Sequence, residues 1–135
     1  MATLADVRRI ALSLPGSEKA RDRIAFSVRN KGKLKGFAWV WMERVHPTKS
    51  RVPNPAVLAV RVPSLADKER LLAESADKYF TEPHYEGFPA VLVRLAAMRT
   101  ADLKPLLTEA WRCQAPTDLR IQVPEVARKL KGRRR

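Results

Sequence analysis

Cysteine and histidine are scarce in this sequence, which has one Cys and two His among its 135 residues. With Cys113 as the single cysteine, a disulfide within the chain is excluded, and a reducing, intracellular compartment is favoured. Neither His46 nor His84 shows metal-ligand spacing to Cys113, so we expect no metal site. We expect Cys113, at helical spacing from Leu106 and Ala110, to act as a small hydrophobic side chain.

Long hydrophobic runs and common catalytic motifs are also missing. The apolar stretches are only a few residues long, whereas a membrane helix needs about 20. The start of the chain, residues 1–7, lacks the basic and apolar regions of a signal peptide. The sequence contains neither a Gly-x4-Gly-Lys-Ser/Thr phosphate loop nor a Gly-x-Ser-x-Gly elbow, and its carboxylates are scattered. We therefore expect a cytoplasmic protein without a membrane partner, a cofactor or enzymatic activity.

Acidic side chains are few relative to basic ones. The chain has 14 Asp+Glu against 27 Lys+Arg, which gives a net charge of +13. Residues 19–51 hold ten basic and two acidic side chains, and residues 126–135 hold six basic and none acidic. The remaining positions carry a net charge of −1, so two segments account for the whole excess. An excess of this size indicates an anionic partner such as nucleic acid.

Hydrophobic periodicity predicts one domain over residues 1–125 followed by a basic tail over residues 126–135. The first helix begins after Thr3, with Asp6 placed to complete a capping box, and its apolar stripe extends to Leu14. The other predicted elements, in chain order, are strands over 23–28, 36–42 and 57–62, a helix after Ser64 with Leu65, Leu71, Leu72 and Ala76 facing inward, a strand over 90–95 and a helix over 100–115.

This α-β-β-β-α-β-α order predicts an α+β, two-layer fold, with an antiparallel sheet and helices packed on one face. Trp39 and Trp41 lie in the predicted central strand, so we expect both in the core. Three prolines within residues 43–56 predict an extended, exposed loop.

A basic hairpin is the most informative segment for function. Asn30-Lys31-Gly32-Lys33 predicts its turn, and its four basic side chains alternate along the chain, which would direct them to one side of an extended strand. The next loop adds three more basic residues, and we expect the two loops to project as a pair of wings that bind phosphates. The candidate contact residues are Arg29, Lys31, Lys33 and Lys35 in the first wing, Arg44, Lys49 and Arg51 in the second, and Arg133, Arg134 and Arg135 in the tail. The alternative is that these lysines only solubilise an exposed hairpin and protect its edge.

Aromatic residues gather in residues 79–89, where His84 and Tyr85 are candidates for a ligand or partner contact or for a structural hydrogen bond. These aromatics are not interleaved with lysines. This arrangement favours contact with a duplex backbone over stacking on single-stranded bases.

Several segments occur together in a characteristic order and spacing. They are Leu14-Pro15-Gly16-Ser17-Glu18, Phe26-Ser27-Val28-Arg29, residues 33–38, residues 57–62, residues 80–95, Glu109-Ala110-Trp111-Arg112 and Ala115-Pro116. Over about residues 4–118 the chain thereby resembles the MmcQ/YjbR-like family of small bacterial proteins. The resemblance implies a CyaY-like fold, related in shape to frataxin, and DNA binding through a double wing. A frataxin-like iron role needs an acidic helix face, whereas here Asp6 is accompanied by Arg8 and Arg9.

The leading hypothesis is a non-enzymatic protein that binds double-stranded DNA through phosphate contacts, with Arg29 and Arg51 placed to enter a groove. Three alternatives remain at this point. They are RNA or ribosome association, a protein-interaction module that uses residues 79–89, and a small-molecule enzyme that uses His84 or Tyr85. Sequence alone does not determine the oligomeric state.

Overall fold

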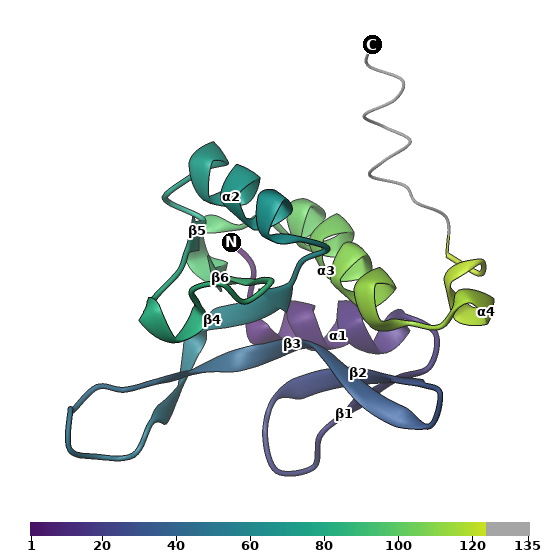
Figure 1. The fold of residues 1–135 in the computed structure, drawn as a ribbon, viewed down its shortest axis with the longest axis horizontal. Helices are drawn as coiled ribbons and strands as arrows, with labels where there is room; N and C mark the ends of the chain where they lie inside the picture. The colour runs from purple at the N-terminus through teal and green to yellow at the C-terminus, as the bar shows by residue number, and fades with distance from the viewer. Residues whose placement is uncertain (124–135) are drawn as a thin grey trace.

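A six-stranded antiparallel sheet with the strand order β1-β2-β3-β4-β6-β5 organises the fold (Figure 1). The computed structural model describes residues 1–123, so the predicted tail and the domain boundary at residue 125 lie outside the described residues. The strands are β1 (Ser17–Lys19), β2 (Ala25–Asn30), β3 (Lys33–Glu43), β4 (Val52–Arg61), β5 (Tyr79–Phe80) and β6 (Ala90–Arg94). The helices are α1 (Leu4–Ser13), α2 (Leu65–Glu74), α3 (Thr100–Gln114) and α4 (Thr117–Arg120), with 3-10 turns η1 (Pro83–Tyr85) and η2 (Leu95–Ala97).

The first helix has the predicted cap. The Thr3 hydroxyl accepts a hydrogen bond from the Asp6 backbone N–H, and the Asp6 carboxylate accepts one from the Thr3 N–H. This capping box satisfies two donors that the first helical turn leaves without partners.

The predicted α+β class is confirmed, and the main core lies between the sheet and the helices. Phe26, Leu58 and Val91 from the strands pack with Leu107 and Trp111 from α3 in one buried cluster. In Figure 1 the helices lie on the same side of the sheet, with α2 above the β5–β6 edge. The large apolar side chains on this face of the sheet are thus removed from contact with water. This burial is the main source of stability in such a fold.

The opposite face of the sheet, called the outer face below, carries a second and smaller cluster. Tyr85, on the loop that precedes β6, packs there with Trp39, Trp41 and Phe80. The two tryptophans are therefore half-buried in this second cluster and do not lie in the main core, as had been expected of a central strand.

The prolines before the third predicted strand do not exclude a strand, as the sequence had suggested. Strand β4 begins at Val52 and includes Pro53 and Pro55. The register with β3 shifts at this point, because Trp41 is paired with Asn54 while its neighbour Val40 is paired with Leu58. β6 is paired with β4 from Val57 onward, so the proline-containing part of β4 is an edge with an irregular ladder, where proline is tolerated.

Other differences concern short or amphipathic elements. The three-residue β1, the two-residue β5 and the four-residue α4 were not predicted, because such short segments have no measurable periodicity. In α2, Leu65 is expected to face inward but is exposed, and Lys68 is the buried residue; Ala76, expected on the same inward face, lies beyond the end of the helix and is exposed. Within residues 1–123, none of the helices has both the length and the hydropathy that crossing a membrane requires.

Candidate nucleic-acid interface

The first predicted wing is a tight two-residue hairpin between β2 and β3. Lys31 (φ 55°) and Gly32 (φ 80°) both adopt left-handed backbone conformations, as the favoured hairpin turn requires. The Asn30 side-chain amide donates a hydrogen bond to the Gln114 carbonyl at 2.9 Å, which fastens the hairpin to the end of α3. The basic tip is therefore held by the helix layer.

The four basic side chains of the hairpin do not share one side, in contrast to the prediction. Buried Val28 is paired with Lys35, and paired residues of an antiparallel ladder project to the same face. Lys35 and Lys33 therefore extend from the helix-covered face. Arg29 projects from the outer face, where its Nε lies 3.3 Å from the Glu18 carboxylate. The tight turn changes the alternation that an uninterrupted strand would have kept.

The second predicted wing covers residues 44–55, but only residues 44–51 form a loop, because β4 begins at Val52. The loop's own arginines hold it in shape. Arg44 donates to the Lys49 carbonyl at 2.8 Å, and Arg51 donates to the Met42 carbonyl at 3.0 Å. The side chains of Arg44 and Lys49 are exposed, and that of Arg51 is half-exposed. A loop supported in this way presents cations at defined positions.

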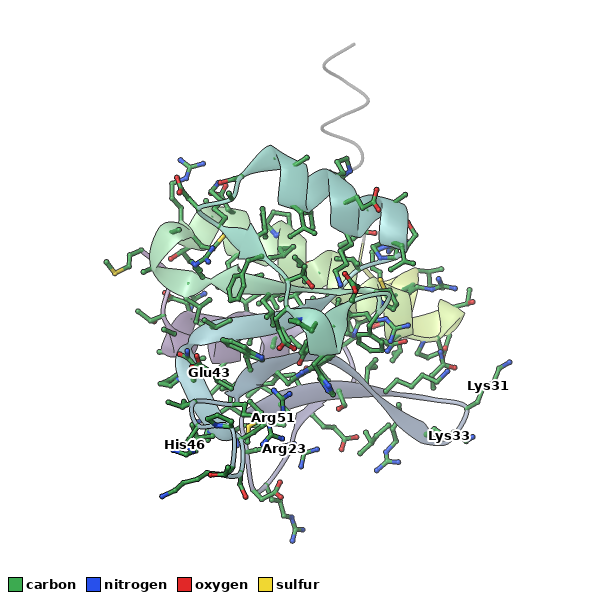
Figure 2. All side chains as sticks on the ribbon, turned by 60° about the vertical axis from the view of Figure 1, so that its left-hand side comes forward. Arg23, Lys31, Lys33, Glu43, His46 and Arg51 are labelled. Carbon is green, nitrogen blue, oxygen red and sulfur yellow. The ribbon has the colours of Figure 1, made fainter. Side chains whose placement is uncertain are left out.

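The two wings lie at opposite ends of the sheet and do not project as a pair. They are separated by the 11 residues of β3, which span about 33 Å at the usual rise of a strand. Figure 2 shows Lys31 and Lys33 at one end and His46 and Arg51 at the other. This separation follows from topology, because successive hairpins of an antiparallel meander fall at alternate ends of its strands.

A third loop joins the second wing. Residues 20–24 connect β1 to β2 and reach the same end of the sheet as residues 44–51, where the Ile24 carbonyl accepts the Val40 N–H at 2.9 Å. Arg23 of this loop lines the same hollow as Met42, whose carbonyl accepts the hydrogen bond from Arg51, and the two arginines fall in the same part of the view in Figure 2. We name the basic residues of these two loops, together with Lys19 at the end of β1, the loop-end cluster; it consists of Lys19, Arg21, Arg23, Arg44, Lys49 and Arg51.

The loop-end cluster is strongly positive. Its six basic side chains are accompanied by Asp22 and Glu43, which leaves a net charge of +4. Asp22 forms an exposed ion pair with Arg23 at 3.4 Å, and Glu43 accepts a hydrogen bond from Asn54 at 2.9 Å. Exposed pairs of this kind are weak and exchange readily for a phosphate. The end of the sheet thus presents a compact positive surface.

The sequence alone does not predict that residues 20–24 contribute to the site. These basic residues, Lys19, Arg21 and Arg23, belong to the basic segment over residues 19–51, but the sequence does not show which surface they lie on. The missing information was the three-residue strand β1, because its pairing with β2 turns the intervening loop toward the second wing. The alternation Ser17-Glu18-Lys19 before a predicted strand is a weak signal for that pairing.

The aromatic loop is packed onto the sheet. Tyr85 is buried, and its hydroxyl accepts a hydrogen bond from the Trp39 indole at 3.0 Å. Burial raises the pKa of Tyr85 above its usual value, so the phenol is neutral. His84 is exposed, and its ring meets that of Tyr85 edge-on at 5.6 Å. Of the two predicted contact residues, His84 therefore lies on the surface, while Tyr85 holds the loop in place.

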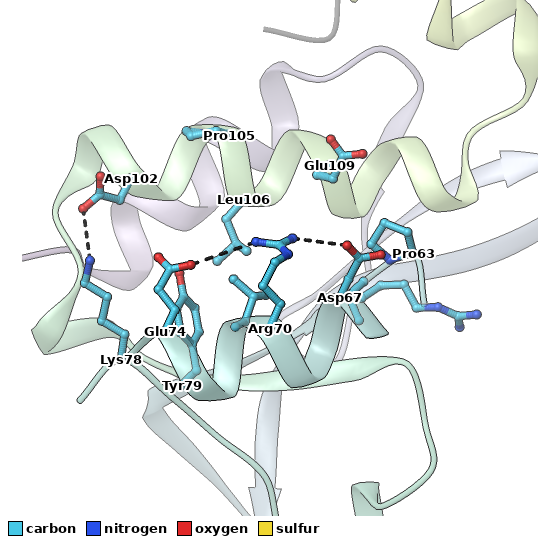
Figure 3. A pocket seen from close by; sticks show the side chains of 13 residues that line it. Pro63, Asp67, Arg70, Glu74, Lys78, Tyr79, Asp102, Pro105, Leu106 and Glu109 are labelled. Carbon is cyan, nitrogen blue, oxygen red and sulfur yellow. Dashed lines mark hydrogen bonds and ion pairs between the residues drawn. The ribbon is translucent and has the colours of Figure 1, made fainter. Parts of the chain in front are cut away.

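A groove of about 400 Å³ lies between α2 and α3, on the helix side of the molecule (Figure 3). Three of its carboxylates are in ion pairs: Arg70 lies 3.2 Å from Asp67 and 4.0 Å from Glu74, and Lys78 lies 3.7 Å from Asp102. Glu109 also lines the groove. Neither His84 nor Tyr85 lines this groove.

The side chain of Cys113 is half-buried in α3. Burial raises the pKa of its thiol to about 11, so the thiol is protonated and a poor nucleophile at neutral pH. Among residues 1–123, no three His, Cys, Asp or Glu side chains are grouped so that they could hold a metal ion.

Comparison of the structure with solved proteins gives one clear match. The crystal structure of the Deinococcus radiodurans protein DR2400, described as a DUF419 domain, superposes with a TM-score of 0.65 over 93% of this chain and 91% of that chain. The chain has the fold of a DUF419 domain. Such domains belong to the MmcQ/YjbR-like fold family, so the resemblance seen in the sequence is confirmed at the level of the fold. The sequences are 19% identical, and the likeness concerns the fold alone.

Sequence comparison finds mycobacterial relatives. The chain is 47% identical over 70 residues to the uncharacterized protein Rv2570 of Mycobacterium tuberculosis and to the uncharacterized protein Mb2600 of Mycobacterium bovis. The matched part is 52% of this chain and 54% of the relative, so the chain spans about half the length of the curated relatives it matches. No family model matches the sequence.

Proposed function

We propose that this chain is a member of the MmcQ/YjbR-like family and binds nucleic acid, with duplex DNA as the preferred form, without catalysing a reaction. The observation that carries the proposal is the loop-end cluster. Two loops that are separate in sequence lie at the same end of the sheet and carry a net charge of +4 together with Lys19, Asp22 and Glu43; Arg23 of one loop lines a hollow with Met42, whose carbonyl accepts a hydrogen bond from Arg51 of the other. Clustered Lys and Arg side chains attract the phosphate backbone, which dominates the affinity of such proteins.

The separation of the two basic ends also fits a duplex. Strand β3, which joins the hairpin tip at Lys31 and Lys33 to residues 44–51, has 11 residues and spans about 33 Å, close to one turn of B-DNA at about 34 Å. Phosphates on one side of a duplex recur once per turn. Under this proposal the hairpin tip and residues 44–51 contact the same side of a single duplex, whereas they would not converge on one compact anion.

The aromatic loop offers less support for the protein-interaction alternative. Its aromatic surfaces are already used within the molecule: Tyr85 is buried, Phe80 lies under the Arg94 guanidinium at 4.1 Å, and Phe88 lies near that of Arg61 at 5.3 Å. RNA association would use the same basic side chains as DNA binding. Comparing the affinities for duplex DNA and duplex RNA therefore distinguishes the two functions.

The decisive test removes charge from the loop-end cluster with little structural effect. Arg21 and Lys49 are exposed, and within residues 1–123 their side chains form no hydrogen bond, so the double variant Arg21→Gln, Lys49→Gln preserves the loops. Binding to fluorescent duplex DNA, duplex RNA and single-stranded DNA is followed by anisotropy at several salt concentrations. We expect weaker duplex binding, and a log–log salt slope that is flatter by about 0.9 for each lost phosphate contact.

The matched control is Arg8→Gln, Lys104→Gln, which removes the same charge from exposed positions on α1 and α3. This variant is expected to keep wild-type affinity and slope. Equal losses in both double variants would show that binding follows total charge and has no defined surface. If the wild type does not bind any of the three probes near physiological salt, the proposed function is wrong.

A further inference from the structure

The outer face of the sheet is divided into a covered half and an open half. Residues 81–89 cover the part formed by β4 and β6, where Tyr85 packs against Ala59 and Leu92. Over β1 to β3 lies an open hollow of about 460 Å³. Its lining includes Arg23, Ser27, Leu34, Gly36 and Trp39. This volume falls within the range of sites that hold small organic groups.

Gly36 keeps the floor of the hollow open. Its φ is not positive, so the backbone at this position does not require glycine. A Cβ built there would lie 3.8 Å from the six-membered ring of Trp39 and 3.9 Å from the Ser27 hydroxyl. The absent side chain therefore exposes an edge of the indole, and the small Ser27 beside it leaves the space above free. A glycine inside a strand often marks such a close approach of a ligand.

The remaining lining of the hollow combines apolar groups with the charged side chains of Lys19, Arg23 and Glu18, and the Glu18 carboxylate is paired with Arg29 at 3.3 Å. Leu34 is 50% exposed and borders the Trp39 ring side of the floor. Arg23 stands on the rim, and the guanidinium of Arg51 is held on the carbonyl of Met42, which also lines the hollow. An exposed part of an aromatic ring with arginines nearby is an arrangement suited to an unpaired base together with its phosphates.

We propose that this hollow holds one unpaired nucleobase of a bound strand, which packs against Trp39 across Gly36 while its phosphates lie on Arg23 and Arg51. The proposal rests on the proposed function and deepens it, since it adds a base site beside the phosphate contacts of the loop-end cluster. The protein would then prefer a duplex that carries an unpaired segment over a fully paired one.

The test compares a fully paired fluorescent duplex with the same duplex extended by about four unpaired thymidines, a length suited to a small single-strand site. Wild-type protein is expected to bind the extended probe at least about fivefold more tightly, since one stacked base contributes that much or more. Its tryptophan fluorescence is expected to be quenched by the extended probe. The variant Gly36→Leu fills the hollow and should abolish both effects while the paired duplex binds as before.

Two further variants complete the design. Ser27→Leu fills the hollow from the neighbouring strand and replaces Gly36→Leu if thermal melting shows that the latter does not fold. Ala96→Leu adds the same bulk at an exposed position in η2 and should keep the wild-type preference.

The outcomes separate the two proposals. If wild-type protein binds the paired duplex without preferring the extended probe, or if the preference persists in both filled variants, the base site is wrong while the phosphate contacts stand. If wild-type protein does not bind the paired duplex, the proposed function fails and the base site falls with it.

Discussion

Lys68 is the buried charged residue of the described chain, with 4% of its surface exposed. Its ammonium group donates hydrogen bonds to the carbonyls of Tyr85 and Phe88, at 2.9 Å for the second. Burial lowers the pKa of Lys68 below its usual value, and the nearby negative charge of Glu86 opposes this shift. One side chain on α2 thereby fixes the loop that covers half of the outer face.

Replacing Lys68 with Met keeps a long side chain but removes the donor. Two carbonyls then lose their buried partner, and we expect the free energy of unfolding to fall by about 1–3 kcal/mol in urea denaturation. Lys104→Met, at an exposed position in α3, serves as the control and should change stability by less than about 0.5 kcal/mol. Wild-type stability in the Lys68 variant would mean that aromatic packing alone holds the loop.

At the scale of single elements, the capping box of α1 is the clearest link from sequence to stability. The Asp6 carboxylate accepts the Thr3 backbone N–H at 3.0 Å, and this bond is the main cause that lowers the pKa of Asp6 below its usual value. The ion pair with Arg9 adds to the effect. A lowered pKa in the folded state means that the ionised carboxylate stabilises α1.

Two variants test the capping box. Thr3→Ala removes the other half of the box and is expected to lower the free energy of unfolding by about 1 kcal/mol.

Asp6→Asn should destabilise the protein at pH 7. Its difference from wild type should shrink as the pH falls below the usual aspartate pKa of 3.8 and through the lowered folded value, since Asp6 then becomes protonated in both states. A difference that stays constant down to pH 2 would contradict the role assigned to the charge. Chemical denaturation at a series of pH values measures both variants.

The hairpin and β4 show why element-level prediction was incomplete. The turn at Lys31 and Gly32 was predictable from its residues, because local backbone preference determines it. The faces of Lys33 and Lys35 were not, because they depend on the register with β2. The extent of β4 depends likewise on a partner strand that accommodates Pro53 and Pro55.

At the scale of the whole molecule, the hairpin tip and the loop-end cluster lie at opposite ends of the sheet. The helices cover the face of the sheet that is opposite the outer face (Figure 1). The basic tail at residues 126–135 lies outside the described residues, and its contribution to binding is a separate question.

Shortening the chain at Val126 separates the tail from the folded surface. We expect the truncated protein to bind duplex DNA with a smaller salt slope than the full chain, because the six basic residues of the tail are lost. Adding Arg21→Gln and Lys49→Gln to the truncated protein should weaken it further. Binding that vanishes on truncation alone would assign the affinity to the tail and contradict the role of the loop-end cluster. Anisotropy titrations over a range of salt concentrations measure each step.

The sequence by itself determined the α+β class, the cap of α1 and the position of the basic segments along the chain. These depend on periodicity, on local hydrogen bonds and on charge, which neighbouring residues express directly. Only the tertiary structure decided that residues 20–24 and 44–51 lie at the same end of the sheet, that the hairpin tip lies at the other end, and that Gly36 leaves part of Trp39 uncovered. Those facts follow from strand pairing and register, which join segments far apart in sequence and which no local pattern encodes.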